Sequence, residues 1–356
     1  MQNKKINVCF LGAFTAGGTE SACFKVANGL CKKYNIFIIN TSKMKNTFFL
    51  EKYIKFYNLQ SNSIYKKNRE IYYLLKKNKI EILITLEAMA GIFSIVPAKF
   101  AGCKHIIWEH ANYYQNQGSK WIQKIRQIEL ILTDAYVVLT NRDLRNFKKH
   151  FFFNKKLKKI YNIADTNICN SYSINSKVII SVGHIRKIKN FSIIPEIAKI
   201  IFLKHCDWKW IIYGDTFGEE YDYIKTKINQ YGLENNIIFY GRCNDMRIEY
   251  SKAAIYVMTS LQEGLPMVLL EAKSARLPLV SFDIETGPDE IIRDGVNGFL
   301  IPPYDIKIMA NKICELIEDN KKRIEFSNNS ILDLELFEEE FILTQWEDLI
   351  DEVKGI

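Results

Sequence analysis

The sequence predicts an α/β protein made of two doubly wound, Rossmann-like domains that face each other across a cleft. Short apolar segments rich in strand formers alternate with amphipathic segments of helical length, which is typical of a parallel sheet covered by helices. This alternation occurs twice, and a chain of 356 residues is too long for one ordinary core but suits two. The net charge also changes sign near the middle of the chain.

Each half of the chain contains its own series of expected strands, and helix-like segments separate most of them. Examples of these segments are 20–33 and 69–79 in the first half and 196–203 and 221–231 in the second. In the first half the expected strands are residues 6–14, 35–40, 80–86, 105–109 and 135–140. In the second half they are residues 178–183, 208–214, 237–241, 255–259, 279–282 and 299–301. Strands and helices in this order predict a parallel sheet in each half.

The charge distribution marks the boundary between the two halves. Residues 1–165 carry 28 Lys and Arg against 10 Asp and Glu, whereas residues 166–356 carry 21 against 30. The segment 161–166 lies where the sign changes, and we interpret it as the linker. We therefore expect a first domain over 1–165, a second over 166–335, and a C-terminal helix over 336–356 that packs back toward the first domain.

The basic first half favours a polyanionic partner. Nucleic acid fits poorly, because the sequence carries no nucleic-acid-binding motif and the acidic second half would weaken a continuous groove. An anionic membrane surface fits better, at roughly 1 kcal/mol for each Lys or Arg close to the lipid. Aromatic and basic residues are interleaved in 113–126 and in 148–159, which suits a membrane interface but also an ordinary solvated helix with aromatic residues in the core.

The composition excludes several other classes of protein. No apolar run reaches membrane-spanning length and no N-terminal signal peptide is evident, so we expect a cytoplasmic protein that is at most peripheral on the inner face of the cytoplasmic membrane. The eight cysteines are scattered without a Cys-x-x-Cys pair, which argues against a zinc site and for buried free thiols in a reducing compartment. No Asp-x-Asp-type metal motif is present, so we expect no metal site.

The most informative segment is Glu263-Gly-Leu-Pro-Met-Val-Leu-Leu-Glu271, which follows the expected strand 255–259. It predicts a tight loop that leads into a helix, so that Glu263 lies at the carboxyl end of the strand and Glu271 about two turns into the helix. Ligands of open α/β sheets bind at these strand ends, and a helix N-terminus binds anions. Because two carboxylates accept hydrogen bonds from hydroxyl groups, the pattern favours a nucleotide-sugar, whose phosphates lie between two hydroxylated rings.

Cationic residues follow the first strand of the second half. Gly183 allows close backbone approach, and His184, Arg186 and Lys189 come soon after it. Cationic side chains at a strand end would neutralise a diphosphate where water is partly excluded. The same composition also occurs in a solvated basic loop, but the position after a strand favours phosphate binding.

Three further strand ends carry weaker signals. Gly17-Gly18-Thr19-Glu20 follows the first strand and opens a helix that Thr19 would cap. This motif is not Gly-x-Gly-x-x-Gly, which argues against a dehydrogenase. His110 ends a strand, where it is either a donor or acceptor for a ligand or a structural histidine. Arg242 and Cys243 follow another strand, where their backbone groups would contact the edge of a base.

Together these motifs resemble those of the retaining glycosyltransferases of family 4, which have the GT-B fold. The resemblance is densest over 177–303, and weaker signals cover most of the first half. Glu263 and Glu271 match the Glu-x7-Glu spacing of that family. They occur between Tyr240-Gly241 and Asp294-Gly-Val-Asn-Gly298, in the order that the family shows.

The resemblance implies a role for each residue of the site. Glu263 would contact the hydroxyls of the donor sugar, and Glu271 would hold those of the ribose. His110 would lie near the donor sugar, and the loop Gly17-Gly18-Thr19-Glu20 near the acceptor and the phosphates. The implied catalytic residues are Glu263, His110 and Lys189, and the implied donor-binding residues are Gly183, His184, Arg186, Lys189, Arg242, Cys243, Gly264, Leu265, Pro266, Met267 and Glu271.

The phosphate motif departs from the family pattern. The usual Gly-Arg-x-x-x-x-Lys is replaced by Gly183-His184-x-x-x-x-Lys189. Lys189 matches the pattern directly. Either His184 binds the phosphate more weakly than arginine would, or Arg186 takes over that role.

The implied reaction is transfer of a hexose or N-acetylhexosamine from a nucleoside diphosphate sugar, with UDP as the expected nucleotide, to a saccharide acceptor with retention of configuration. The resemblance to capsule and lipopolysaccharide enzymes of bacteria implies a lipid-linked acceptor, bound by the first domain. No cofactor or metal ion is needed, because cationic side chains and backbone N–H groups stabilise the leaving diphosphate. Two alternatives stay open: a UDP-sugar epimerase of the same fold, and a non-catalytic protein that binds nucleotide-sugars or glycans.

Overall fold

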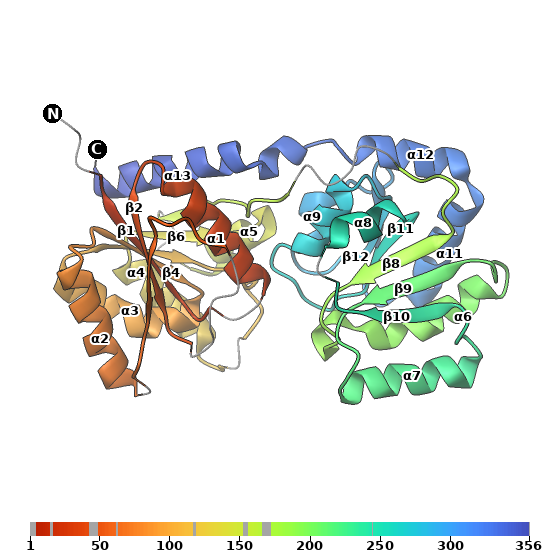
Figure 1. Ribbon diagram of the computed structural model, residues 1–356, viewed down its shortest axis with the longest axis horizontal. Coiled ribbons are helices and arrows are strands. Elements are labelled where there is room, and N and C mark those ends of the chain that lie inside the picture. The colour runs from red at the N-terminus through yellow and green to blue at the C-terminus, as the bar shows by residue number, and fades with distance from the viewer. Residues whose placement is uncertain are drawn as a thin grey trace. The chain divides into compact units, whose positions relative to one another are not determined.

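The computed structural model describes residues 5–14, 17–42, 49–61, 63–116, 119–151, 156–165, 172–243 and 245–355 (Figure 1). The chain forms two compact units. The first comprises Met1–Ile163 together with Leu336–Ile356, and the second comprises Ala164–Glu335. Each unit is built around its own parallel sheet, which confirms the predicted class of two Rossmann-like α/β domains.

The first unit contains a seven-stranded sheet in the order β3-β2-β1-β4-β5-β6-β7, in which all neighbours are parallel. The strands are β1 (Asn7–Gly12), β2 (Asn35–Asn40), β3 (Lys55–Asn58), β4 (Ile82–Leu86), β5 (Lys104–Trp108), β6 (Ala135–Val138) and β7 (Leu157–Lys159). The five strands predicted for this half are confirmed. The sequence did not predict β3 and β7, because these edge strands have four and three residues and no buried apolar run.

The helices of the first unit are α1 (Gly18–Leu30), α2 (Ile64–Lys77), α3 (Ala88–Ala101), α4 (Ile122–Leu132), α5 (Asn141–His150) and α13 (Glu339–Lys354). Two of them begin at side chains that cap the helix. Ser63 Oγ accepts a hydrogen bond from the backbone N–H of Lys66 at the start of α2, and Thr140 Oγ1 accepts one from that of Asp143 at the start of α5.

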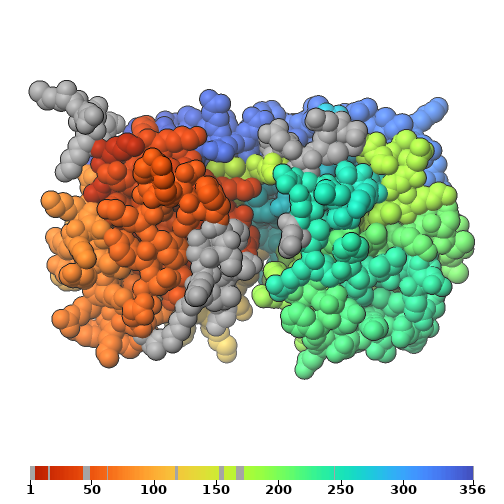
Figure 2. Space-filling view, viewed as in Figure 1, coloured from red at the N-terminus to blue at the C-terminus, as the bar shows by residue number. Residues whose placement is uncertain are grey.

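The C-terminal helix α13 packs on α1 and covers one side of the first unit (Figures 1 and 2). Gly29 of α1 leaves room for Leu343 of α13, because a Cβ atom on this glycine would come within 2.3 Å of the leucine Cδ1. Trp346 of α13 is fully buried, and its ring meets that of Trp108 edge to face with 4.7 Å between centroids. The last helix is thus part of the core of the first unit.

The second unit contains a six-stranded sheet in the order β10-β9-β8-β11-β12-β13, again with parallel neighbours. The strands are β8 (Val178–Val182), β9 (Lys209–Tyr213), β10 (Ile237–Gly241), β11 (Ile255–Met258), β12 (Leu279–Phe282) and β13 (Gly298–Ile301), and all six were predicted. The helices are α6 (Ile194–Phe202), α7 (Glu219–Tyr231), α8 (Met246–Ser251), α9 (Met267–Ser274), α10 (Pro288–Ile291), α11 (Ile306–Glu318) and α12 (Asn320–Asn329). Short 3₁₀ turns at Lys187–Lys189 and Phe191–Ile193 precede α6.

The order of strands reverses beside the first strand of each sheet. In the first unit β1 lies between β2 and β4, and in the second unit β8 lies between β9 and β11. The carboxyl ends of these strands are the topological switch points, where ligands of open α/β sheets bind. The site of the second unit is therefore expected in the loops that follow β8 and β11.

Among the described residues, no helix combines the length and the hydropathy that crossing a bilayer requires. The seven cysteines in the described part of the chain are free thiols. Burial raises the pKa of Cys9 and Cys23 well above the usual value of a thiol, so these two groups are protonated and unreactive in the core of the first unit.

Candidate functional site

The Glu263–Glu271 segment folds as a loop that joins β11 to α9. Glu263 lies in this loop, beyond the carboxyl end of the strand, and Glu271 lies on the second turn of the helix. The turn between them is supported from the loop that follows β12. Thr286 Oγ1 donates a hydrogen bond to the carbonyl oxygen of Glu263 at 2.7 Å. Gly287, at φ 105°, packs so closely that a Cβ atom there would lie 2.6 Å from the carbonyl oxygen of Gly264.

Lys189 contacts Glu263 directly at the switch point of the second sheet. Lys189 Nζ lies 2.6 Å from Glu263 Oε1, and Ser260 Oγ donates to the same carboxylate oxygen at 2.7 Å. The lysine and glutamate side chains are 24% and 12% exposed, so most of this pair is shielded from water. A charge-assisted contact of this kind is shorter and stronger than one between neutral groups.

The backbones of the two switch-point loops are also tied together. Thr259 Oγ1 donates to the carbonyl oxygen of Lys189 at 3.0 Å, and the N–H of Leu261 donates to the carbonyl oxygen of Ile188 at 2.8 Å. The loop after β8 and the loop after β11 therefore form one surface, on which the cation of Lys189 is placed beside the carboxylate of Glu263.

A row of three side chains, two charged and one a histidine, lies at the ends of β8, β9 and β10. His184 Nδ1 lies 2.9 Å from Asp215 Oδ2, and Arg242 Nε donates to Asp215 Oδ1 at 2.5 Å. The hydrogen bond from Arg242 and then that from His184 lower the pKa of Asp215 below its usual value, so this group is a carboxylate at neutral pH. Arg186 is exposed, and no side-chain contact with another described residue holds it. Cys243 Sγ lies 3.3 Å from the carbonyl oxygen of Asp245.

Glu271 is oriented by a tyrosine that sequence reasoning missed. Tyr250 lies on α8, and its hydroxyl donates to Glu271 Oε2 at 3.1 Å. Burial, followed by the negative charge of Glu271, raises the pKa of Tyr250 well above its usual value, so the hydroxyl keeps its proton as a donor. Thr286, Ser260 and Asp215 were missed as well. Among these residues only Asp215 carries a signal in the sequence, because it follows Gly214 at the end of a strand.

The predicted residues of the first unit lie at the carboxyl edge of its sheet. His110 follows β5, is 8% exposed, and packs against Trp108 with 4.6 Å between ring centroids and an angle of 44° between the ring planes. Its Nε2 atom has no hydrogen-bond partner in the described part of the chain. Burial lowers the pKa of His110 to about 3, so the imidazole is neutral at physiological pH. A neutral imidazole can form hydrogen bonds but carries no charge to offer an anion.

The Gly17–Glu20 loop differs in one respect from the prediction. The N-cap residue of α1 is Gly17, and Thr19 lies inside the first turn, so Thr19 does not cap the helix. Gly18 begins the helix, and Glu20 is buried with its carboxylate against Gly17, where a Cβ atom would lie 2.7 Å from Glu20 Oε2. The absence of a side chain at Gly17 is what allows this close approach.

Glu87 is a further unpredicted feature at the switch point of the first sheet. It follows β4 and precedes α3 with φ 65° and ψ 144°, a conformation that residues with a Cβ atom rarely adopt. Burial, then the charges of Glu109 and Glu20, raises the pKa of Glu87 to about 7. Strained residues of this kind gather at functional sites, where the surrounding structure holds them in place.

The segment 113–126 was given two interpretations, a membrane-docking patch or an ordinary helix with aromatic residues in the core, and part of it belongs to the core. Tyr113 and Arg126 are buried. Arg126 Nε donates to Glu109 Oε2 at 3.0 Å and Nη1 donates to the carbonyl oxygen of Tyr113 at 2.6 Å, so the arginine belongs to a buried ion pair. Trp121 is 62% exposed, and Lys124 Nζ lies 4.4 Å from the centre of its ring.

The second aromatic segment, 148–159, is described only in part. Phe151 is buried against Phe147 and Tyr113, whereas Phe152 and Phe153 lie outside the described residues. Lys156 Nζ donates to the carbonyl oxygen of Thr133. The described part of this segment therefore contributes the aromatic side chain of Phe151 to the core.

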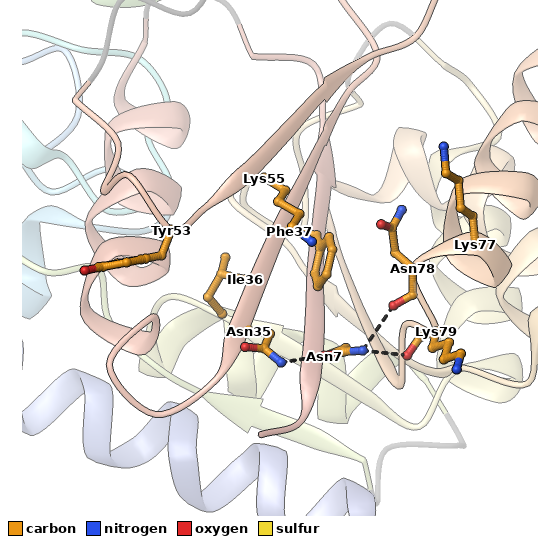
Figure 3. A pocket seen from close by; sticks show the side chains of 9 residues that line it. All are labelled: Asn7, Asn35, Ile36, Phe37, Tyr53, Lys55, Lys77, Asn78 and Lys79. Atoms are coloured by element: carbon orange, nitrogen blue, oxygen red, sulfur yellow. Dashed lines mark hydrogen bonds between the residues drawn. The ribbon is translucent and has the colours of Figure 1, made fainter. Parts of the chain in front are cut away.

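A pocket of about 350 Å³ lies at the amino edge of the first sheet, at the opposite end of the strands from the switch point (Figure 3). Its amides are engaged within the protein. Asn7 Nδ2 donates to the carbonyl oxygens of Asn78 and Lys79, and Asn35 Nδ2 donates to Asn7 Oδ1. The lysines that line it are exposed to solvent, so the pocket offers no buried group to a ligand.

The chain is similar to known glycosyltransferases. Residues 170–333 match the family model described as glycosyl transferases group 1. An uncharacterized glycosyltransferase of Haemophilus influenzae is 28% identical and covers 98% of this chain and 100% of its own length. A Campylobacter jejuni enzyme named as an α-1,4-N-acetyl-D-galactosaminyltransferase acting on a glycan-diphosphoundecaprenol is 26% identical and covers 97% of this chain and 98% of its own.

Among solved structures, HepE of Anabaena in complex with UDP superimposes with a TM-score of 0.82 at 17% identity, covering 98% of this chain and 100% of that one. This likeness shows the fold. The family match and the relatives show the class of enzyme. The chain is therefore a glycosyltransferase with the GT-B fold, and its residues 170–333 are similar to the group 1 glycosyl transferases.

Proposed function

We propose that this glycosyltransferase transfers a hexosyl or N-acetylhexosaminyl group from a UDP-sugar to a saccharide acceptor, with retention of the anomeric configuration. The observation that carries the proposal is the contact between Lys189 and Glu263 at the switch point of the second sheet. A nucleotide-sugar offers phosphate oxygens to the cation and sugar hydroxyls to the carboxylate. The N-terminus of α9 follows on the same loop and favours the same anion.

The donor contacts follow from this arrangement. Lys189, together with His184 or Arg186, neutralises the diphosphate as it leaves. Glu263 accepts hydrogen bonds from the hydroxyls of the transferred sugar, and Glu271 accepts them from the ribose. Backbone N–H groups of the loop that contains Gly264, Leu265 and Met267 also face the leaving group, whereas Pro266 has no N–H to donate. Arg242 and Cys243 contact the base.

The choice of UDP is supported by the fold neighbour HepE, which was solved with UDP bound. In this scheme cationic side chains supply the positive charge at the diphosphate, so the reaction needs no metal ion. Retention follows if the acceptor oxygen approaches on the face of the sugar that the diphosphate leaves. The neutral imidazole of His110 and the Gly17-Gly18-Thr19-Glu20 loop contribute hydrogen bonds to the sugar and the acceptor.

The acceptor is a lipid-linked saccharide of a bacterial surface glycan, such as a lipopolysaccharide or a capsule. The Campylobacter jejuni relative supports this part of the proposal, because its name specifies an undecaprenyl diphosphate-linked glycan. The basic first half then docks the enzyme on anionic lipid at the inner face of the cytoplasmic membrane. Trp121, with Lys124 against its ring, is exposed and supplies an aromatic and basic contact of the kind that suits an interface.

The first experiment is a thermal-shift and calorimetric panel of UDP-, GDP- and ADP-linked hexoses and N-acetylhexosamines in the presence of EDTA. Selective stabilisation by one UDP-sugar supports the donor assignment, and the same sugar then enters a transfer assay with lipid-linked glycans. Release of an epimerised sugar without an acceptor would favour the epimerase. Binding without either transfer or hydrolysis would favour a non-catalytic protein. Stabilisation by GDP- or ADP-sugars alone would overturn the choice of UDP.

A variant of Glu263 tests the role of the carboxylate. Glu263→Gln removes the charge that Lys189 contacts and one acceptor for the sugar hydroxyls, so we expect turnover to fall by roughly 10-fold to 100-fold while UDP affinity changes little, given about 1.5–3 kcal/mol for a charge-assisted hydrogen bond. Glu234→Gln, on an exposed turn of the same unit, is the matched control. Loss of UDP affinity with unchanged turnover would contradict the assignment.

A further inference from the structure

The row His184–Asp215–Arg242 arises from a repeated pattern at three neighbouring strand ends. Strands β8, β9 and β10 are adjacent in the sheet. A glycine ends β10 or directly follows β8 and β9, and a charged or titratable residue comes next: Gly183-His184, Gly214-Asp215 and Gly241-Arg242. The glycines bring the strand ends together, since Gly183 N–H donates to the carbonyl oxygen of Tyr213 at 2.9 Å and Gly214 N–H donates to that of Gly241 at 3.0 Å.

Gly214 fixes the distance between the first two loops. A Cβ atom on this residue would lie 2.1 Å from the carbonyl oxygen of Gly183, which is backbone and unable to give way. The absence of a side chain therefore allows the loop after β9 to approach the loop after β8 closely enough for Asp215 to reach His184. Each carboxylate oxygen of Asp215 then has its own partner, His184 Nδ1 at 2.9 Å and Arg242 Nε at 2.5 Å.

Exposure differs sharply along this row. The Asp215 side chain is 14% exposed, whereas those of His184 and Arg242 are 44% and 70% exposed. The carboxylate is thus the shielded member, and the two basic groups project toward solvent from it. A carboxylate near an anion site would repel a diphosphate unless its charge is engaged, and here both of its oxygens are engaged by the two flanking side chains.

We infer that Asp215 is a positioning residue that holds the His184 imidazole with Nε2 directed toward the diphosphate of the donor; this inference rests on the proposed function. When Nδ1–H donates to Asp215, the rotation of the ring is fixed, as in other carboxylate–imidazole pairs, and the doubly protonated ring carries a second N–H at Nε2. A protonated ring then donates from Nε2 to a phosphate oxygen with charge assistance. The Asp215–His184 pair thus binds the diphosphate at the position where the family pattern has an arginine.

The other charged groups near this row either have partners of their own or are exposed without a partner that orients them. Lys189 is paired with Glu263 on the neighbouring loop. Glu249 of α8 accepts a hydrogen bond from Tyr213 at 2.6 Å and contacts Lys252 at 2.9 Å. Arg186 is exposed, and no side-chain contact with a described residue orients it. On the loop after β8, Lys189 is thus directed to Glu263, and His184 is the basic side chain that Asp215 directs.

The test compares UDP with uridine, because uridine lacks the phosphates that His184 would contact. Calorimetry is run on the wild type, Asp215→Asn, His184→Arg and the double variant His184→Arg/Asp215→Asn. We expect Asp215→Asn to weaken UDP binding about fivefold or more and to leave uridine binding unchanged. In the His184→Arg background the same change should alter UDP affinity less than about twofold, because a guanidinium has no tautomer to select and keeps its charge. Asp222→Asn, on the exposed face of α7, controls for loss of one negative charge.

Each other outcome overturns the inference in a recognisable way. Tighter UDP binding in Asp215→Asn would show that the carboxylate competes with the diphosphate. Equal weakening of UDP and uridine would indicate a structural role. Equal losses with and without His184→Arg would show that Asp215 acts through Arg242 alone. If the wild type binds no UDP, the proposed function itself fails, whereas UDP binding that Asp215→Asn does not affect refutes only the role of Asp215.

Discussion

Lys273 offers a quantitative test of how the second unit is held together. It lies on α9, two residues after Glu271, is 1% exposed, and donates from Nζ to the carbonyl oxygen of Ile291 at 3.0 Å. Burial lowers the pKa of Lys273 from 10.5 to about 8, against the opposing attraction of Asp333. Between these two pH values the unfolded chain binds a proton that the folded protein has released, so this residue makes stability increase with pH.

The magnitude follows from the two pKa values. Over the whole window a shift of about 2.5 units corresponds to about 3.4 kcal/mol, and between pH 7 and 9.5 the contribution is about 2 kcal/mol. Lys273→Met removes this pH-dependent contribution to the free energy of unfolding, and the methionine side chain fills a similar volume. The carbonyl oxygen of Ile291 keeps a second donor, Asn297 Nδ2 at 3.2 Å, so the lost hydrogen bond costs only about 1 kcal/mol.

The assay is differential scanning calorimetry of both proteins from pH 7 to 9.5. At pH 7 we expect Lys273→Met to be as stable as the wild type or more stable. Between pH 7 and pH 9.5 the free energy of unfolding of the wild type should rise relative to that of the variant by about 2 kcal/mol, which corresponds to about 4–8 °C in melting temperature for a unit of this size. Tyrosine and cysteine ionisation affects both proteins equally and cancels in the difference. A difference that stays constant across this pH range would refute the reasoning, because it would mean that Lys273 is neutral, or charged, in both states throughout.

Three further substitutions test individual contacts. Gly214→Ala places a Cβ atom 2.1 Å from the carbonyl oxygen of Gly183, so calorimetry should show UDP affinity reduced by roughly tenfold or more together with a lower melting temperature, and an unchanged affinity would contradict the close packing of the two loops. Tyr250→Phe removes the donor to Glu271, and equilibrium binding should show UDP held about fivefold more weakly, whereas equal affinity would argue against Glu271 as the ribose ligand. Glu87→Gly relieves backbone strain at φ 65°, and thermal unfolding should show a gain of roughly 1 kcal/mol, while a loss of stability would mean that the side chain stabilises the fold more than the strain costs.

The arrangement of the fold was largely predictable because the strands of a parallel sheet are buried on both faces and form continuous apolar runs. Segments 35–40, 237–241 and 279–282 were predicted with the boundaries that β2, β10 and β12 have in the structure. The edge strands β3 and β7 were not predicted, because half of their residues or more are exposed or only partly buried and form no apolar run. The helices were less sharply bounded, since α2 starts at Ile64, several residues before the amphipathic segment predicted at 69–79.

The contacts within the site were less predictable than its position. Spacing along the chain places Glu263 and Lys189 after strands that are neighbours in a doubly wound sheet, and the structure brings their side chains within 2.6 Å. Nothing in the spacing reveals that Tyr250 reaches Glu271, because α8 and α9 are separated by a strand. The basic and aromatic composition of 113–126 does not reveal that Arg126 pairs with Glu109 in the core, where a buried arginine is stable only because a carboxylate and two carbonyl oxygens satisfy it.

The charges of the two halves show why net charge is a weak guide to ligand chemistry. The second half carries 30 acidic against 21 basic residues, and the sequence places the candidate site for a doubly negative diphosphate there. This is physically consistent because what a ligand encounters is the set of groups within a few ångströms, where screening is weakest, and not the sum over a domain. In that neighbourhood Asp215 is matched by His184 and Arg242 and Glu263 by Lys189, whereas Glu271 accepts a hydrogen bond from the neutral hydroxyl of Tyr250. The surplus acidic residues lie elsewhere, for example in the first turns of α7 and α13, where they stabilise helix N-termini.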